Sequence, residues 1–345
     1  MEKFNCGNPV RRTTLAVLVK ARDVSINYEK VEKITEEWSR AMPAIPKWSG
    51  KFHLKTSNKN QALTYVLLLD ALNFCFWPAS LKKKKWQVNY KGNWFGGYYG
   101  LSISLKRFFE ENPKLANWRY FSKISFKDFS KIFSGEGPKV PSISEGPKVP
   151  SISEGELQLL KERWTIVRTL SRYLIKKYKG NSATFVKSAK HSLSALIPKI
   201  ANELPSFNDS VIYQGKRIYF LKRAQILATD LIGAFDGKGY GYFKDRGYLT
   251  ALADYRVPQI LNEWGIIEYS KNLKEKIKKG ELIKVGSSEE VEIRSATIWA
   301  VEYLRDALAR KGKKIHSFEI DWILWNKTRN EKMKLPHHLT KTIFY

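Results

Sequence analysis

The sequence predicts a mainly α-helical globular protein with a small β-sheet. Apolar residues recur at helical spacing through most of the second half, and one segment of the first half alternates apolar and polar residues as paired strands do. Of the 345 residues, 43% are hydrophobic and 13% are aromatic, which is enough for a packed core and far from the composition of disordered chains. We therefore expect a folded chain in which any disorder is local.

The first half is predicted to combine helices with one pair of strands. Residues 1–55 mix short helical patterns with prolines, and the next helix is apolar on nearly every side until Pro78 stops it, which is typical of a buried helix. An alternating segment, a glycine-containing turn and a second short segment then predict a hairpin. In chain order we predict a buried helix at 60–77, a strand at 86–90, a turn at 91–93, the partner strand at 94–99 and a further helix at 101–111.

A tandem repeat separates the two halves. The nine residues Glu-Gly-Pro-Lys-Val-Pro-Ser-Ile-Ser occur at 136–144 and again at 145–153, and their proline and glycine exclude regular structure. Two copies are too few for a solenoid, which needs about three stacked units. We predict a duplicated surface loop at 134–156, between an N-terminal part at 1–133 and a helical part at 157–345 that packs with it and carries the chemistry.

Helices dominate the prediction for the second half. Five segments show helical periodicity, at 157–178, 184–196, 222–235, 247–261 and 272–279. Ser287 and Glu290 have the spacing of a capping box before a long helix that ends at Gly312. A last helix is predicted at 318–327.

Charge and composition limit the classes of function. The formal charge of +28 attracts polyanions and phosphorylated ligands alike, and the short, scattered basic clusters favour a solvated surface over a nucleic-acid groove. The two cysteines and five histidines lack the spacing of a disulfide framework or a metal site, so we predict no metal. No apolar run is long enough to span a membrane and no signal peptide is recognisable, so we expect a cytoplasmic protein.

Four aspartates lie within strongly apolar segments or beside turns, namely Asp70, Asp230, Asp254 and Asp321. Aspartate is a poor helix former and is rarely buried without a partner, so each needs either a buried salt bridge or a place in a polar pocket. Asp254 has the most specific context, because Pro258 offers no N–H to the carbonyl of residue 254 and the helix should break there. Such a carboxylate can project into a cleft, or it can simply cap the helix that starts near Pro258.

Three weaker signals accompany these aspartates. Phe74 and Trp77 lie three residues apart on the predicted buried helix and can stack on a planar base, although such a pair is more often part of a core. His53 is a lone histidine and by itself fits a structural role. Lys222 and Arg223 can neutralise a phosphate, although a solvated basic face explains them as well.

Several longer motifs occur in order along the chain. They are Leu-Asn-Phe-Cys-Phe-Trp at 72–77, Gly-Lys-Arg at 215–217, Lys-Arg-Ala-Gln-Ile-Leu at 222–227, Phe-Lys-Asp at 243–245, Ala-Asp-Tyr-Arg at 253–256 with Pro-Gln at 258–259, Glu-Val-Glu-Ile-Arg at 290–294, and Asp321 with Leu-Trp at 324–325. In this order they resemble the queuosine salvage family, whose members are queuosine 5′-phosphate N-glycosylases that release the 7-deazaguanine base queuine. The similarity covers nearly the whole chain. Its departures are the duplicated loop and Asn326, where the family pattern has an acidic residue.

The resemblance implies a helical fold akin to DNA glycosylases and hydrolysis of the N-glycosidic bond of queuosine 5′-monophosphate without a cofactor. It assigns Asp254 to the reacting sugar, as nucleophile or as stabiliser of an oxocarbenium-like transition state. An ionised aspartate accepts a pair of N–H donors such as a deazaguanine edge presents, so Asp230 and Asp321 are the candidates for reading the base. The other candidates for substrate binding are His53, Ala228, Tyr255 and Gln259.

Two other functions stay open at this point. The charge and the expected fold also suit a glycosylase that acts on a flipped base in nucleic acid, although no basic recognition helix stands out. A non-catalytic carrier of queuine or of a nucleotide is the other alternative. The resemblance favours a small nucleotide as the partner, with no stable nucleic-acid complex and no membrane contact.

Overall fold

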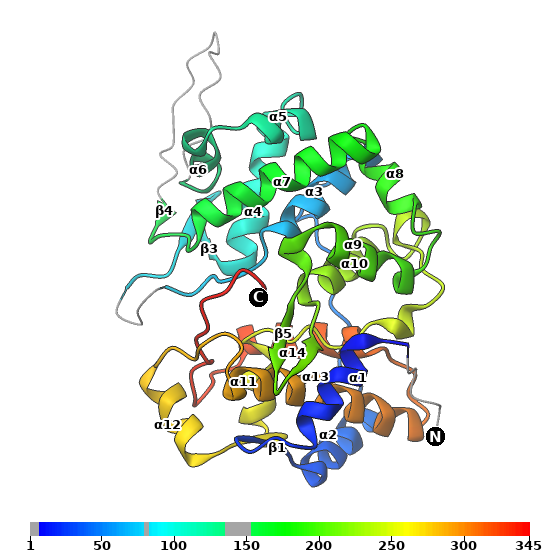
Figure 1. Ribbon diagram of the computed structural model, residues 1–345, viewed down its shortest axis with the longest axis vertical. Helices are drawn as coiled ribbons and strands as arrows, with labels where there is room; N and C mark the ends of the chain where they lie inside the picture. The colour runs from blue at the N-terminus through cyan, green and yellow to red at the C-terminus, as the bar shows by residue number, and fades with distance from the viewer. Residues whose placement is uncertain (1–6, 79–82, 135–152) are drawn as a thin grey trace. The chain divides into compact units, whose positions relative to one another are not determined.

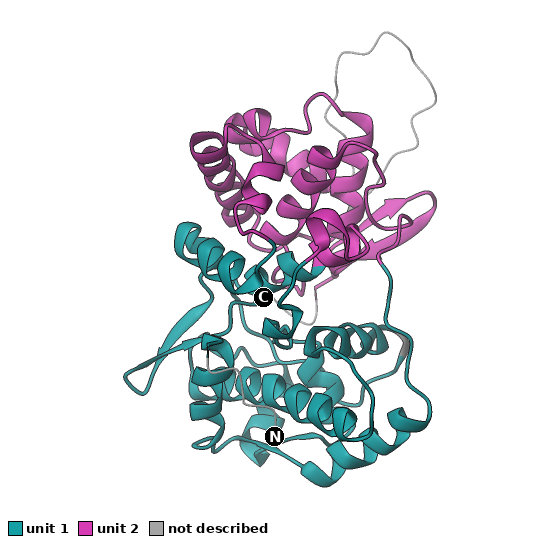
Figure 2. Ribbon diagram, turned by 90° about the vertical axis from the view of Figure 1, so that its right-hand side faces the viewer, with its two compact units in different colours: residues 1–47, 191–229, 243–345 teal, residues 48–190, 230–242 magenta. Residues whose placement is uncertain are grey.

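The computed structural model describes residues 7–78, 83–134 and 153–345. The chain forms two compact units that are interleaved along the sequence (Figure 1). Unit 1 comprises residues 1–47, 191–229 and 243–345, and unit 2 comprises residues 48–190 and 230–242 (Figure 2). Apart from Ser153, the tandem repeat lies outside the described residues.

Unit 1 is mainly helical, with two pairs of short strands. Its α-helices are α1 (Pro9–Leu18), α2 (Tyr28–Arg40), α9 (Leu193–Glu203), α11 (Val257–Glu263), α12 (Lys271–Lys279), α13 (Ser288–Arg310) and α14 (Ser317–Asn330). The antiparallel pairs are β1 (Val24–Ile26) with β7 (Ile267–Tyr269) and β5 (Ser210–Tyr213) with β6 (Lys216–Tyr219). The 3-10 helices η1 (Pro205–Phe207) and η3 (Arg246–Tyr248) complete the unit, and α10 (Lys222–Ala234) begins in unit 1 and ends in unit 2.

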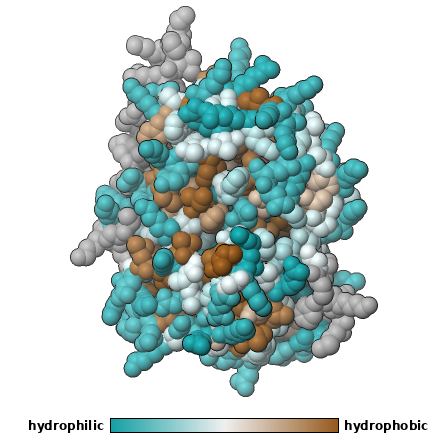
Figure 3. All heavy atoms as spheres, viewed as in Figure 1, coloured by the Kyte–Doolittle hydropathy of each residue, from teal (hydrophilic) through white to brown (hydrophobic). Residues whose placement is uncertain are grey.

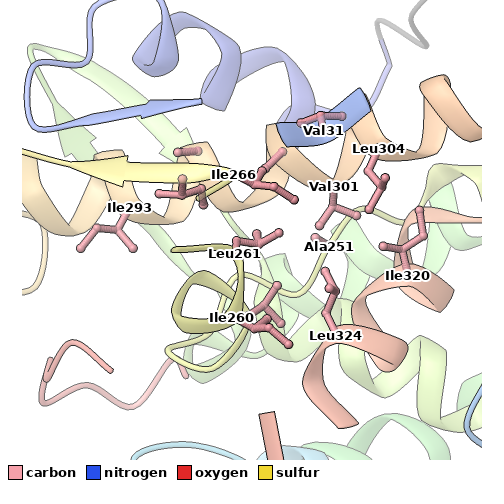
Figure 4. Packing of buried hydrophobic residues seen from close by; sticks show 14 of the residues in the cluster. Val31, Ala251, Ile260, Leu261, Ile266, Ile293, Val301, Leu304, Ile320 and Leu324 are labelled. Carbon is pink, nitrogen blue, oxygen red and sulfur yellow. The ribbon is translucent and has the colours of Figure 1, made fainter. Parts of the chain in front are cut away.

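The long helix α13 forms the centre of unit 1, where it contacts α1, α2, α11 and α14. Its predicted start is confirmed, because the Ser287 hydroxyl accepts the N–H of Glu290 at 3.4 Å. The Glu290 carboxylate instead accepts the N–H of Gly286 at 3.0 Å, so the reciprocal half of a capping box is absent at this helix start. Buried aliphatic side chains of α13 pack against those of α11 and α14 and exclude water from the core (Figure 4).

Unit 2 is a second helical cluster with a small sheet. Its α-helices are α3 (Lys59–Ala71), α4 (Gly97–Glu111), α5 (Trp118–Lys123), α6 (Phe126–Ser134), α7 (Leu160–Tyr178) and α8 (Ser182–Lys187), followed by the 3-10 helix η2 (Gly239–Gly241). The sheet has the order β3 (Asn93–Gly96), β2 (Gln87–Tyr90) and β4 (Ser153–Glu154). The predicted pairing is confirmed, because β2 and β3 are antiparallel and Tyr90 lies opposite Asn93. The second strand ends at Gly96, however, and residues 97–99 form the start of α4 and not the end of a strand.

The buried helix predicted at 60–77 ends earlier than expected. From Leu63 onward α3 is buried, as its apolar sequence predicts. The chain then leaves the helix because the Arg163 guanidinium on α7 binds three carbonyl oxygens of the next segment, and Cys75 has a φ of 42° that an α-helix does not allow. The prediction that Phe74 and Trp77 share one helix face is therefore wrong; the Phe74 ring instead lies 4.0 Å from the Arg163 guanidinium.

Two more predicted helices are divided by local backbone effects. The segment 184–196 is split between α8 and α9, since Lys190 and His191 adopt φ values of 49° and 58°. The segment 247–261 opens with the end of the 3-10 helix η3 and is α-helical only from Val257, where α11 begins. Before that point the side chain of Asp254 takes the N–H groups that a continuing helix would use.

The described residues confirm a mainly α fold with small sheets. Hydrophilic side chains cover most of the face seen in Figure 3, with smaller apolar patches between them. In the described ranges, no helix has both the length and the apolar character needed to cross a membrane.

Candidate active site

Asp254 lies in unit 1, in the segment that leads into α11, and its carboxylate has one bound and one available oxygen. Oδ1 accepts the backbone N–H groups of Arg256 at 2.7 Å and of Val257 at 3.0 Å. No group in the described part of the chain hydrogen-bonds Oδ2. The capping interaction that the sequence left open is thus present, and it orients the carboxylate without using both oxygens.

Lys222 and Asp321 are ionisable neighbours of Asp254. Asp321 lies on α14 and accepts the N–H of Leu252 at 2.8 Å through Oδ2, while Lys222 is the first residue of α10. Burial raises the pKa of Asp254 above its ordinary value, and the charge of Lys222 and the two backbone N–H groups offset part of this effect. Burial, followed by the charge of Asp254, holds the pKa of Asp321 well above its ordinary value. Two buried carboxylates and one lysine therefore influence each other electrostatically.

A buried ion pair supports the backbone around this cluster. Arg294 on α13 forms a two-point ion pair with Asp209, with distances of 2.9 and 2.5 Å, and its Nε donates to the carbonyl oxygen of Ala253 at 3.1 Å. The same Asp209 accepts the backbone N–H of Lys222 at 3.0 Å. The pair thereby connects the residue before Asp254 with the start of α10.

The other predicted residues of unit 1 already contact protein groups. The Tyr255 ring lies against His337, with ring centroids 4.5 Å apart. The Gln259 amide donates to the carbonyl oxygen of Leu335 at 2.8 Å and accepts from the neighbouring arginine at 3.3 Å. Ala228 is fully buried on α10. None of these contacts tests the predicted roles of the three residues in substrate binding, which stay predictions.

A second polar cluster, in unit 2, contains His53 and Asp230. Nδ1 of His53 donates to the carbonyl oxygen of Ser49 at 3.0 Å, and its ring stacks on Trp48 with centroids 3.7 Å apart. Nε2 of His53 lies 3.0 Å from the hydroxyl oxygen of Tyr98, which is 3.1 Å from Oδ2 of Asp230. Two predicted residues are therefore joined by a tyrosine that the sequence analysis did not select.

The residues described by the structure contain no group of three or more His, Cys, Asp or Glu side chains arranged to hold a metal ion.

Comparison with known proteins reveals the relatives of this chain. The model of a family described as "Queuosine salvage protein" matches residues 52–345. The chain belongs to this family. It is 39% identical over 338 residues to a protein of Sphaerobacter thermophilus, 35% identical over 349 residues to one of Dictyostelium discoideum and 33% identical over 348 residues to one of Mus musculus. All three are named "Queuosine 5'-phosphate N-glycosylase/hydrolase", and the alignments cover 97% of this chain and 97 to 98% of each relative.

In this member of the queuosine salvage protein family, Lys222 and Arg223 have different surroundings although they are adjacent. Arg223 donates to the carbonyl oxygen of Ser206 and lies 4.9 Å from the Phe207 ring, which are structural contacts. Lys222 instead contributes its charge at Asp254. The two residues cannot be distinguished in the sequence, because only the fold determines which of them acts on the Asp254 carboxylate.

Tyr98 was missed because its signal is weak in a single sequence. It follows Gly96 and Gly97 at the junction between β3 and α4. A tyrosine after two glycines at a strand-to-helix junction is a place where a polar side chain can be presented by a tight turn. The neighbouring Tyr99 has the same local context, so the sequence alone does not choose between them.

Proposed function

We propose that this chain hydrolyses the N-glycosidic bond of queuosine 5′-monophosphate and releases queuine, and that Asp254 acts at C1′ of the ribose. The observation that carries the proposal is the carboxylate of Asp254, a residue that is 8% exposed. Two backbone N–H groups hold one of its oxygens and the other oxygen is available. The names of the relatives support the choice of substrate.

The chemistry requires a fixed negative charge beside the sugar. When the bond from C1′ to the base breaks, its electron pair leaves with the base and positive charge develops on C1′ and the ring oxygen. A pre-oriented carboxylate stabilises this charge or forms a transient bond to C1′. Water then adds to C1′ and loses a proton, while the released base gains one.

The ionised form of Asp254 is the reactive one. Burial disfavours that form, and the positive charge of Lys222 favours it. We propose that Lys222 keeps the carboxylate charged at neutral pH. In this scheme Asp230 and Asp321 accept N–H donors from the base, and His53, Ala228, Tyr255 and Gln259 complete substrate binding.

We also propose that the protein acts in the cytoplasm on the free nucleotide and forms no stable complex with nucleic acid. The low cysteine content fits a reducing compartment. The net charge of +28 favours one alternative, a glycosylase that acts on the modified base within tRNA. A non-catalytic queuine carrier is the other alternative.

Incubation with two substrates separates these functions. We expect queuine, measured by chromatography, to appear from queuosine 5′-monophosphate and not from intact queuosine-modified tRNA. Release from the tRNA would refute the mononucleotide assignment. Binding of the mononucleotide without any release would identify a carrier and refute the enzymatic assignment.

A pair of matched variants tests Asp254. Asp254→Asn keeps an acceptor for the two N–H groups but removes the charge, so we expect kcat to fall roughly 100- to 1,000-fold. Asp245 provides the control, because its carboxylate also accepts two N–H groups, those of Leu193 and Ser194, at the start of α9. Asp245→Asn should retain turnover, and comparable activity of the Asp254 variant would remove Asp254 from the mechanism.

A further inference from the structure

The C-terminal segment at 334–345 belongs to unit 1 and lies along one side of α11. The backbone N–H of Lys334 donates to the Glu263 carboxylate at 2.9 Å, and the carbonyl oxygen of Leu335 accepts the Gln259 amide at 2.8 Å. The two partners on α11 are four residues apart, so they lie on the same face of the helix, one turn from each other. The segment therefore runs from the end of α11 toward its start, where the proposed catalytic carboxylate lies.

At the start of α11 the segment contacts the residue that follows Asp254. The ring of His337 lies beside that of Tyr255, with centroids 4.5 Å apart and an angle of 37° between the planes. Nδ1 of His337 donates to the carbonyl oxygen of His338 at 2.9 Å, and His338 is itself 2% exposed. This hydrogen bond to a buried residue restrains the His337 ring at its place beside Tyr255.

The segment also reaches the residue that precedes Asp254, through Arg294. Nε of Arg294 donates to the carbonyl oxygen of Ala253 at 3.1 Å. The Tyr345 ring lies on the Arg294 guanidinium, 4.2 Å from its central carbon, and the Tyr345 hydroxyl donates to Oε1 of Glu290 at 2.9 Å. Since Tyr345 is only 1% exposed, its ring keeps water from the guanidinium that holds the Ala253 carbonyl.

The backbone is thus restrained on both sides of Asp254 by residues that contact one segment. Oδ1 of Asp254 accepts the N–H groups of Arg256 and Val257, so a movement of the neighbouring backbone would turn the carboxylate. An error of about 1 Å in the position of a reacting group can cost about 100-fold in rate. Restraint of this backbone is therefore a requirement for fast turnover.

We infer that His337 and Tyr345 are positioning residues that hold the Asp254 carboxylate in its reactive orientation. The inference rests on the proposed function, in which Asp254 acts at C1′ of the ribose. Neither of the two side chains is proposed to contact the substrate. The C-terminal segment supplies orientation, and the chemistry stays with Asp254.

Steady-state kinetics with queuosine 5′-monophosphate test the role of Tyr345. Tyr345→Ala removes the ring from Arg294, so we expect kcat to fall about 10- to 100-fold. KM should change by less than about threefold, because no group proposed to contact the substrate is lost. Tyr345→Phe loses only the hydroxyl and keeps the ring, so it should retain kcat within about twofold of the unmodified protein.

Leu308→Ala controls for a general loss of stability in unit 1. Leu308 lies near the end of α13 and is fully buried, so its truncation weakens the core without removing a group of the C-terminal segment. At a temperature where all variants are folded, it should retain kcat. Hydrogen exchange of the Arg256 and Val257 amides, which bind Asp254, should be faster in Tyr345→Ala than in Leu308→Ala.

A second pair of variants tests His337, which is half-buried and can be replaced with less risk to the fold. His337→Ala removes the ring beside Tyr255 and should lower kcat about tenfold. His337→Phe keeps a ring at this place and should restore most of the loss. This pair carries the test if Tyr345→Ala does not fold.

The outcomes separate this inference from the function on which it rests. If both alanine variants retain kcat, or if the phenylalanine variants and Leu308→Ala lose as much as they do, the positioning role is refuted and the function stands. If the unmodified protein releases no queuine from the nucleotide, the proposed function is refuted, and with it any role of the segment in turnover. The exchange of the Arg256 and Val257 amides would still show whether the segment holds Asp254 in place.

Discussion

Replacing Arg294 by methionine should destabilise unit 1 by several kcal/mol. The side chains of Arg294 and Asp209 are only 2% and 3% exposed, so the substitution leaves a buried aspartate whose charge is balanced by no partner guanidinium. Breaking a buried pair in this way costs about 3–5 kcal/mol. The loss of the hydrogen bond to the Ala253 carbonyl adds about 1 kcal/mol, while methionine preserves much of the packing between Phe220 and Tyr345. We therefore expect a loss of about 4 kcal/mol or more.

Urea unfolding measures the loss, and hydrogen exchange of the α13 amides reports it for unit 1 specifically. The matched control is Arg310→Met, because Arg310 pairs with Glu32 at 2.6 Å with both side chains more than half exposed; it should cost under about 1 kcal/mol. The double variant Asp209→Asn/Arg294→Met should recover only part of the loss, since the Asp209 charge is removed but the buried Glu290, which also pairs with Arg294 at 3.4 Å, still loses that partner. Equal stability of the two arginine variants would refute the reasoning.

Three other expectations follow from the same contacts. Burial raises the pKa of Asp254 and the charge of Lys222 lowers it, so kcat/KM should fall as the pH drops through a value above the ordinary aspartate range. Lys222→Met should move this acid limb of the pH profile to higher pH, while the control Lys244→Met should leave it in place. An acid limb that does not move in Lys222→Met would contradict the assignment. Arg163→Met should destabilise unit 2 by about 3 kcal/mol, because three carbonyl oxygens lose their donor, whereas the neighbouring Arg168→Met should cost less in the same urea titration. Deletion of residues 136–144, one copy of the repeat, should leave kcat/KM within about twofold of its value in the unmodified protein, as expected if the predicted surface loop is only shortened. An inactive protein would show that the repeat contributes to activity.

Most helices could be predicted because their signals are local. The start of α13 at Ser287, the strands joined at 91–93 and the bounds of α10 within a residue or two all follow from capping, turn chemistry and periodicity. The failures occur where a distant side chain decides the backbone. Arg163 is far from Cys75 in sequence, yet its guanidinium satisfies the carbonyls that let α3 end early.

The candidate site was predictable in part for the same reason. A helix break beside Asp254 is visible from Pro258, and the structure places Asp254 just before α11 as that break predicts. The charge of Asp254 raises the pKa of Asp321, and the charge of Lys222 lowers the pKa of both aspartates. These effects depend on how α10 and α14 pack, so no local sequence pattern indicates them. The predicted likeness to DNA glycosylases likewise stays a prediction.

The carboxylate that caps α11 is also the one proposed to react, so selection for abundance and selection for activity act on the same atoms. Alanine at position 254 would lose the cap, worth about 1 kcal/mol, as well as the charge, whereas asparagine would keep an acceptor for both N–H groups. A mutational scan that scores protein level and turnover separately should therefore find the two substitutions equally inactive but unequally abundant. Surveys that score abundance alone would rank asparagine at this position as harmless.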